Sequence, residues 1–244
     1  MKMLIVSLLP MLFCTLAVLA QEAVEKDVLD TADGKLEILF IGHGSLAFQF
    51  QGKVIHVDPY GDVGDYTKLP KADLILVTHD HPDHLDLKAL GAVRTDKTIV
   101  ICNPSSAGKV KGSTAMKNGD VQTELGIKIE AIPAYNLVNK RPDGEPFHPK
   151  GDGNGYILTF DGKRAYVAGD TENTAEMKSV KGIDIAFLPM NLPYTMTPEM
   201  VADAAKAFKP KILYPYHQGK SDPAEVKKLL EDEKAIEVRV LPLP

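Results

Sequence analysis

A short apolar run followed directly by a cluster of histidines and aspartates constrains this chain more than any other feature. The run Asp73-Leu74-Ile75-Leu76-Val77 is typical of a buried strand, because it is short and almost continuous in apolar residues. The cluster Thr78-His79-Asp80-His81-Pro82-Asp83-His84 comes next, and a helix is expected from residues 85–90. Such clusters at the carboxyl end of a strand are where α/β sheets place their chemistry. We therefore expect an α/β fold with a functional site at this strand end.

The spacing of residues within the cluster suits metal binding. In extended backbone alternate residues point the same way, so His79 and His81 can bind one ion while Asp80 points away. Asp83 and His84 follow as the chain turns and can face a second ion. Imidazole and carboxylate ligands suit zinc first, with iron, nickel or manganese as alternatives, and suit calcium or magnesium less well. The competing interpretation is a polar turn whose histidines only cap the next helix.

The first 20 residues have the features of a secretory signal peptide. Lys2 precedes an almost wholly apolar stretch from Leu4 to Ala20, which ends in Val18-Leu19-Ala20, a pattern suited to a cleavage site. A membrane anchor is the alternative, but the stretch is slightly short to span a bilayer and acidic sequence follows it. We predict cleavage after Ala20, export to the periplasm or the medium, and a single domain over residues 21–244.

Charge and cysteine content narrow the classes of partner. Removing residues 1–20 takes away Lys2 and no acid, which leaves 27 basic and 33 acidic residues. Because the chain has no basic stripe, nucleic acid is not an expected partner. Cys102 is the only cysteine beyond residue 20, so no internal disulfide can form, and its apolar neighbours indicate a core residue. A small-molecule substrate is the expected partner, and the sequence does not indicate an oligomeric state.

Further candidate ligands follow other predicted strands or lie in one long loop. Asp170 and His217 each come shortly after an apolar, strand-like run. The segment from Tyr135 to Gly153 contains His148 and shows no periodicity, and long loops within compact domains are usually functional. Helices are expected to begin near residues 85, 198 and 223. The expected strands span residues 35–41, 46–50, 54–58, 73–77, 99–102, 121–124, 127–133, 154–160, 163–168, 183–188, 211–216 and 236–241.

The order of these residues resembles the metallo-β-lactamase superfamily. The His-x-His-x-Asp-His pattern at residues 79–84, followed by His148, Asp170 and His217, is similar to the order of ligands in that superfamily. The resemblance runs from about Gly34 to Gly219, which is most of the chain after residue 20. It implies a four-layer αβ/βα sandwich of two mixed β-sheets flanked by helices.

The resemblance also implies two divalent metal ions held by seven residues. The implied ligands are His79, His81 and His148 for one ion, Asp83, His84 and His217 for the other, and Asp170 as a bridge. His148 departs from the family pattern, because it lies within the loop and does not directly follow a strand. Asn136 or water is the alternative ligand in its place.

Two other residues are candidates to support the metal site. The resemblance gives Asp58, at the end of a predicted strand, a hydrogen-bonding role beneath the histidine loop, and a plain Asp-Pro turn is the alternative. His43 lies between Gly42 and Gly44, which allow the backbone to pass close beneath the metals. A turn histidine that faces solvent is the alternative there.

A pair of metal ions of this kind implies hydrolysis. Two ions can hold a bridging hydroxide near neutral pH, and the hydroxide attacks a carbonyl or phosphoryl centre. Asp83 and Asp170 would orient the hydroxide and transfer its proton, and Tyr194 would donate a hydrogen bond to the developing oxyanion unless it only belongs to a surface loop. We expect a binuclear metal-dependent hydrolase acting on an ester, lactone or phosphodiester-type bond of a small molecule. A non-catalytic metal-binding protein of the cell envelope is the alternative.

Overall fold

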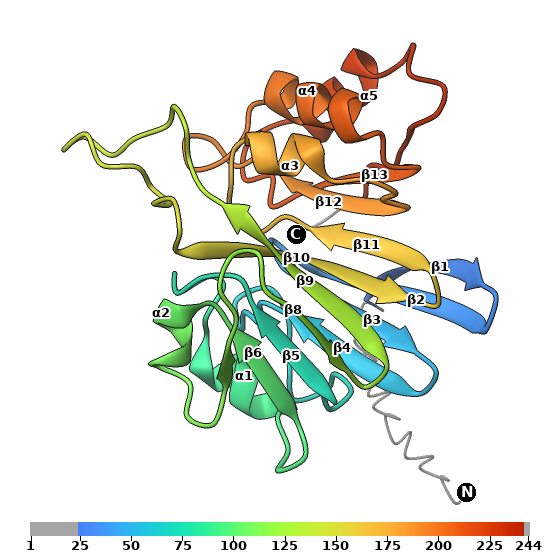
Figure 1. Ribbon diagram of the computed structural model, residues 1–244, viewed down its shortest axis with the longest axis vertical. Helices are drawn as coiled ribbons and strands as arrows, with labels where there is room; N and C mark the ends of the chain where they lie inside the picture. The colour runs from blue at the N-terminus through green and yellow to red at the C-terminus, as the bar shows by residue number, and fades with distance from the viewer. Residues whose placement is uncertain (1–23, 242–244) are drawn as a thin grey trace, which may run out of the picture.

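Two seven-stranded β-sheets lie face to face, with helices on their outer faces (Figure 1). The computed structural model describes residues 24–241, so the predicted signal peptide at residues 1–20 lies outside the described residues. Within each sheet the strands follow one another in chain order. The arrangement confirms the predicted four-layer sandwich of two mixed sheets.

The first sheet is formed by the first half of the described chain. Its antiparallel part changes to a parallel part at the fourth strand. The strand that precedes the histidine cluster is buried along its whole length, as its apolar run predicts. In order the strands are β1 (Glu25–Thr31), β2 (Gly34–Gly42), β3 (Ser45–Phe50), β4 (Lys53–Val57), β5 (Leu74–Val77), β6 (Ile99–Cys102) and β7 (Thr114–Ala115).

The second sheet repeats this plan with the rest of the chain. Its first four strands pair antiparallel and its last four pair parallel. The predicted hairpin turns Leu125-Gly126 and Asp161-Gly162 have positive φ at both residues, which matches the twist of the strands they join. In order the strands are β8 (Val121–Glu124), β9 (Ile127–Ala134), β10 (Gly153–Phe160), β11 (Lys163–Val167), β12 (Ile185–Pro189), β13 (Ile212–Tyr216) and β14 (Glu237–Val238).

An aromatic core fills the space between the two sheets. Phe187 of β12 stacks on Tyr214 of β13 with ring centroids 5.2 Å apart. Phe48 of β3 reaches across from the first sheet to Phe160 of β10, with ring centroids 5.5 Å apart. All four side chains are at most 1% exposed, so these contacts bury large apolar surfaces that hold the sheets together.

The helices cover the outer faces; α4 and α5 begin where the sequence predicts, α1 begins two residues later than expected, and α2 and α3 were not predicted. On the first sheet, α1 (Leu87–Val93) is capped by Asp86 and packs its apolar side on β5. On the second, α4 (Pro198–Phe208) begins after the Thr197 cap and α5 (Pro223–Leu229) after Asp222, each with proline in its first turn. The two short helices are α2 (Pro104–Ala107) and α3 (Ala175–Ser179).

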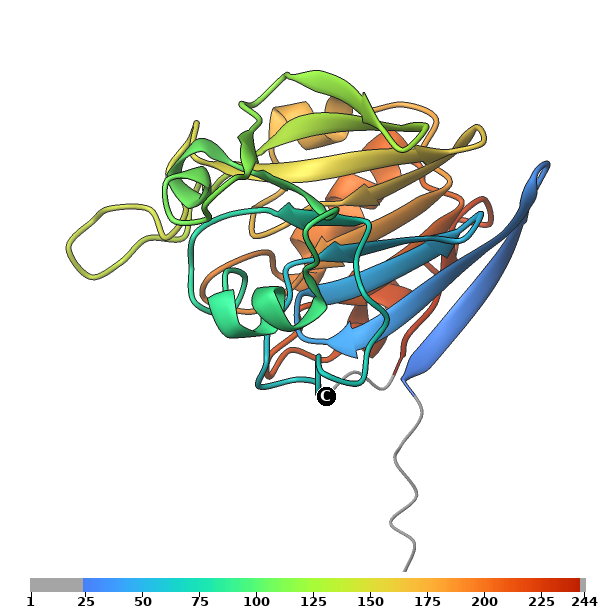
Figure 2. The ribbon, with the colours of Figure 1, turned by 90° about the horizontal axis from the view of Figure 1, so that it is seen from below.

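Three edge strands differ from the expectation: β1 and β7 were not expected, and β14 is shorter than expected. The polar strand β1 was not expected, because all its residues are exposed or partly exposed and it has no apolar pattern. It pairs along its length with β2, and the two strands extend together to one side of the molecule (Figure 2). Asp27 of β1 also binds Tyr214 and Arg239 beneath the second sheet. The last strand was expected over residues 236–241, but β14 covers only Glu237–Val238, since β13 pairs with just these two residues.

The carboxyl ends of the parallel strands gather the polar residues at one edge of the sandwich. Strand β5 leads to the cluster at residues 78–84, β11 leads to Asp170, and β13 leads to His217. The loop between β9 and β10, which contains His148, projects from the body in both views (Figures 1 and 2). Among residues 24–241, no helix is long and apolar enough to cross a membrane.

Candidate metal centre

The structure brings the seven predicted ligands into one cluster. Their ligand atoms form three overlapping groups, and within each group all atoms lie within 4.8 Å of one another. Their role as ligands stays a prediction, whereas their convergence from four separate segments is what the structure shows. The groups are His79, His81 and His148; His79, His84 and Asp170; and His43, Asp83, His84 and His217.

Asp58, at the end of β4, supports the histidine loop from beneath. Its fully buried carboxylate accepts hydrogen bonds from the backbone N of Thr78 at 2.8 Å, from Thr78 Oγ1 at 2.6 Å and from His84 Nδ1 at 2.8 Å. His79 Nδ1 lies 3.0 Å from Thr78 Oγ1. Because both Nδ1 atoms are engaged, the Nε2 atoms of His79 and His84 are left for a metal. Asp58 therefore takes the supporting position and is not a plain turn residue.

Asn136 positions His148 through three hydrogen bonds. The side-chain Oδ1 of Asn136 accepts a hydrogen bond from the backbone N of His148 at 2.7 Å and another from its Nδ1 at 2.9 Å. The backbone N of Asn136 donates to the carbonyl of His148 at 2.9 Å. These bonds fix the imidazole with Nε2 free, and they use the oxygen that Asn136 would need as a ligand. His148 Nε2 lies in the cluster with His79 and His81.

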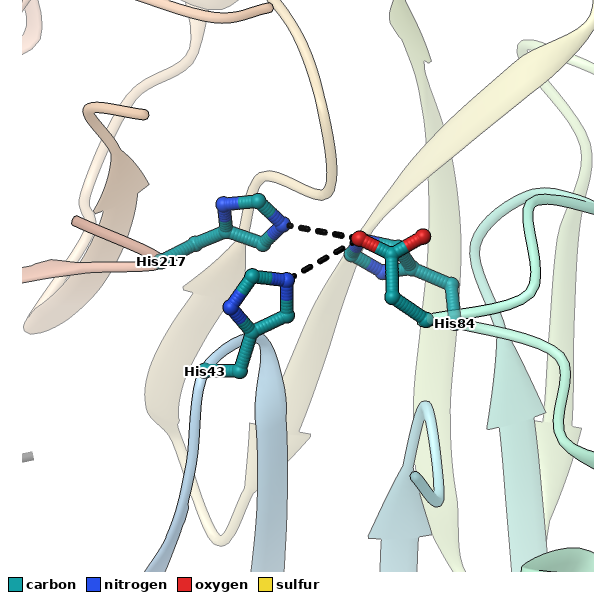
Figure 3. Close-up of side chains that lie close together, drawn as sticks. His43, His84 and His217 are labelled. Carbon is teal, nitrogen blue, oxygen red and sulfur yellow. Dashed lines mark hydrogen bonds and ion pairs between the residues drawn. The ribbon is translucent and has the colours of Figure 1, made fainter. Parts of the chain in front are cut away.

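The turn between β2 and β3 brings His43 to the far side of the cluster. His43 Nε2 donates to Asp83 Oδ2 at 3.0 Å, and its ring centroid lies 3.8 Å from that of His217. Figure 3 shows His43, His84 and His217 with their rings turned toward one another. A Cβ on Gly44 would lie only 2.8 Å from Cε1 of His84, so glycine is needed for this approach. His43 therefore supports the site directly through Asp83.

Asp170 lies between the two sides of the cluster. Its Oδ2 is 3.4 Å from His148 Nε2, whereas its Oδ1 is 3.4 Å from the Nε2 atoms of both His84 and His217. Among the described residues, Asp170 Oδ1, His79 Nε2 and His148 Nε2 are buried without a hydrogen-bond partner. Buried polar atoms are normally satisfied, so the convergence of these three atoms fits a site that can bind a cation.

The electrostatics favour the metal-binding protonation state at His79, His148 and Asp170, whereas the carboxylates of Asp170 and Asp58 outweigh burial at His84 and raise its pKa to about 9. Burial, and then the neighbouring His84, lower the pKa of His79 well below its ordinary value, and burial lowers the pKa of His148 to about 4. Burial opposes ionisation of Asp170, but His217 and His84 hold its pKa below the ordinary value. At neutral pH His79 and His148 are neutral and this carboxylate is ionised, as metal ligands must be.

The cluster opens into a cavity of about 410 Å³, a volume typical of small-molecule sites. Tyr194, predicted to be catalytic, is 44% exposed at this cavity, and its ring lies edge-on to Phe147 with centroids 5.0 Å apart. Arg141 and Asn191 also line the cavity, and the sequence singled out neither residue individually. No motif marks these two residues, because they reach the site from loops of irregular sequence.

Glu172 is a further residue that the sequence analysis missed. It is fully buried, and its carboxylate accepts hydrogen bonds from the backbone N atoms of Leu137, Val138 and Asn139, each at 2.7 Å. It also accepts from Asn136 Nδ2 at 3.2 Å. Glu172 therefore fixes the start of the loop that carries His148. Its position two residues after Asp170 was the only available signal.

Three other sequence candidates lie outside the cluster. Asp80 points away, as predicted, and its Oδ2 accepts a hydrogen bond from Lys109 Nζ at 2.6 Å. His56, on β4, is buried, and its Nε2 donates to the carbonyl of Pro70 at 3.0 Å, so it is a hydrogen-bonded core residue. Cys102 is a buried free thiol in the core between the first sheet and its outer layer, as its apolar neighbours indicate.

Comparisons with known proteins match this chain and its fold. The family model described as "Beta-lactamase superfamily domain" matches residues 37–217. A UPF0173 metal-dependent hydrolase of Thermococcus onnurineus is 32% identical over 82% of this chain and 95% of its own length.

Two solved structures are also similar to the chain. A protein described as a candidate metal-dependent hydrolase from Parabacteroides distasonis superposes with a TM-score of 0.86 at 49% identity, over 91% of this chain and all of that one. The metallo hydrolase Igni18 from Ignicoccus hospitalis gives a TM-score of 0.70 at 26% identity, over 86% and 96% of the two chains. The chain therefore belongs to the metallo-β-lactamase superfamily, and its histidine and aspartate cluster lies at one edge of the two mixed sheets.

Proposed function

We propose that this metal-dependent hydrolase of the metallo-β-lactamase superfamily holds two divalent ions, and that it cleaves an ester, lactone or phosphodiester-type bond of a small molecule. The observation that carries the proposal is the position of Asp170, whose two oxygens face different groups of histidines. A single ion would not need a carboxylate placed in this way. The names of the relatives in Thermococcus onnurineus and Parabacteroides distasonis also support metal-dependent hydrolysis.

The residues present fit a pair of ions. His79, His81 and His148 offer three imidazoles on one side, which is the usual number of protein ligands at a catalytic zinc site. Asp83, His84 and His217 offer a mixed set on the other side. The donor set contains no sulfur, so zinc is our first choice and iron, nickel or manganese are alternatives.

Such ions, when bound, polarise the substrate oxygen and make water a nucleophile near neutral pH. The protein's own residues supply orientation and proton transfer. Asp83 and Asp170 are ionised, since neighbouring histidines outweigh burial and hold the pKa of each below its ordinary value. Either carboxylate can accept the proton of the attacking water and pass it to the leaving group.

Tyr194 is placed to stabilise charge on the substrate. Its hydroxyl makes no hydrogen bond to another residue within the described part of the chain, and the side chain lines the cavity. A phenol at this position can donate to the oxygen that gains charge.

Export remains our proposal for the location of the enzyme, because it depends on the predicted leader at residues 1–20.

The test combines metal analysis with turnover on protein beginning at Gln21. We expect close to two ions per chain by elemental analysis, and hydrolysis of at least one substrate among a 4-nitrophenyl ester, a lactone and bis(4-nitrophenyl) phosphate. Asp170→Asn should abolish turnover, whereas Asp80→Asn, which alters the outward-facing aspartate of the same motif, should not. Tyr194→Phe should lower kcat.

Each contrary outcome points to a different error. One ion per chain at saturation would contradict the binuclear site. Metal binding without turnover of any substrate would favour the alternative, a non-catalytic metal-binding protein of the cell envelope. Unchanged kcat in the Tyr194→Phe variant would remove the oxyanion role of Tyr194.

A further inference from the structure

We propose that Arg141 binds a negatively charged group of the substrate, and that the substrate is a small carboxylate or phosphate with an apolar body. This inference rests on the proposed function, because it names the class of molecule that the same site would hydrolyse. It is carried by Arg141 and by two aromatic side chains, Phe147 and Tyr194, which line the cavity together with the metal cluster.

Arg141 has donors that the protein leaves unused. A guanidinium carries five N–H donors, and here Nη2 alone donates within the described chain, to the carbonyl of Phe147 at 3.2 Å. No carboxylate of the described residues lies within the 4.0 Å ion-pair distance of its nitrogens. By contrast, Lys150 at the end of the same loop is paired with Glu176 at 2.9 Å. An unpaired arginine at a ligand cavity is suited to bidentate binding of a carboxylate or phosphate.

Arg141 is also the only lysine or arginine among the described residues that line this cavity. The carboxylates of Asp83 and Asp170 line it too, but the proposed metal ions would neutralise them. The fixed charge left for the substrate to meet is therefore positive. A neutral substrate would leave this arginine without a partner.

The loop holds Arg141 in a defined place. The backbone N of Arg141 donates to the carbonyl of Glu145 at 2.7 Å, and the N of Gly144 donates back to the carbonyl of Arg141 at 3.0 Å. This closed turn follows the segment that the buried Glu172 fixes. The guanidinium carbon also lies 5.4 Å from the centre of the Phe147 ring, within cation–π range. A side chain held in this way loses less conformational freedom when a ligand binds.

An aromatic surface beside Arg141 accounts for the apolar body. Phe147 and Tyr194 come from different loops, and their rings meet at 77° with centroids 5.0 Å apart. Tyr194 remains 44% exposed at the cavity, although it is a large ring. Exposed aromatic rings in a concave site are typical contacts for apolar parts of a ligand.

The alternative role for Arg141 is to brace the loop through the carbonyl of Phe147. Two esters with the same leaving group separate the roles: mono-4-nitrophenyl glutarate, which ends in a carboxylate, and 4-nitrophenyl valerate, which ends in a methyl group. We would measure kcat and KM for both on metal-loaded wild type, Arg141→Gln and Arg141→Lys. Lys140→Gln is the matched control, because it removes a charge from the neighbouring exposed position outside the cavity.

The expected result is a selective loss. Arg141→Gln should lower kcat/KM for the glutarate by roughly tenfold, mainly through KM, and should change the valerate by less than about twofold. Arg141→Lys should retain part of the preference, and Lys140→Gln should retain all of it. An equal loss on both esters, or no loss on either, would overturn the inference and favour the bracing role.

A binding measurement separates failure of the inference from failure of the proposed function. If wild type hydrolyses neither ester, isothermal titration of 4-phenylbutyrate and of neutral 4-phenylbutanamide decides the inference. Weaker binding of the acid by Arg141→Gln, with binding of the amide unchanged, supports it. Equal binding of the acid by both proteins refutes it, whatever reaction the enzyme catalyses.

Discussion

Replacing Asp58 by asparagine tests how the metal site is held. The substitution keeps the size of the side chain, and asparagine tolerates the positive φ of 46° at this position. It changes one carboxylate oxygen into an NH₂ group. Thr78 can adapt, because its hydroxyl can rotate and its backbone N can still donate to the remaining oxygen. His84 cannot keep its present bond, because Nδ1–H would face a donor.

The expected consequence is a change of tautomer at His84. Nδ1 must lose its proton to accept from the introduced amide, and the proton then sits on Nε2, the atom that lies 3.0 Å from His217 in the cluster. A protonated Nε2 cannot bind a metal. Loss of such a supporting bond typically lowers metal affinity 10- to 100-fold, or about 1.4 to 2.7 kcal/mol. The free energy of unfolding of the metal-free protein should fall by only about 1 kcal/mol.

The assay is competition for metal with a chromogenic chelator, together with urea unfolding of metal-free protein. Asp80→Asn is the matched control, because it makes the same change in a residue that binds Lys109 at the surface. The control should retain wild-type affinity. If Asp58→Asn binds both ions as tightly as wild type, the supporting role of Asp58 and the tautomer argument are both refuted.

Two further predictions concern protonation and the loop ligand. Burial lowers the pKa of His56 from 6.5 to about 4. Between these pH values the unfolded chain binds more protons than the folded one, so the stability that His56 contributes is present above pH 6.5 and is lost as the pH falls toward 4. His56 should contribute about 3 kcal/mol of the loss measured by urea unfolding of metal-free protein, so His56→Gln should lose that much less than wild type. Equal losses would contradict the assignment. His148→Ala should reduce bound metal toward one ion per chain, whereas Asn136→Ala should weaken binding but keep both sites. Two tightly bound ions in His148→Ala would show that His148 is not a ligand.

The sequence predicts the buried strands and the points where they end. Strand β5 is a continuous apolar run because both faces of the first sheet are covered there, and the polar cluster begins where that burial ends. Helix starts are equally local, since Thr197 and Asp222 cap the residues directly after them. Strand β1 could not be predicted in this way, because pairing with β2 holds it and its own side chains are largely exposed.

The residues of the candidate site also differ in whether the sequence alone predicts them. His79 and His81 are recognised by their spacing within one strand end, and the resemblance to a family adds Asp170, His217 and His148. The contacts of His43 with Asp83 could not be read from the chain, because the turn and the histidine loop are 40 residues apart. The burial of Glu172 has the same cause, since its partners lie 33 to 36 residues earlier.

The buried Glu172 also determines which positions at the start of this loop can change without altering its path. Its carboxylate accepts hydrogen bonds from the backbone N–H groups of residues 137–139 and from the side-chain amide of Asn136. The path of the loop there therefore does not depend on which side chains residues 137 and 138 carry. Leu137 and Val138 are 49% and 66% exposed, and they can be exchanged at little cost to folding. Variation at these two positions would change the exposed surface at the start of the loop while the backbone that leads to His148 keeps its path. The scaffold thus separates the part of the loop that can diversify from the part that must remain fixed.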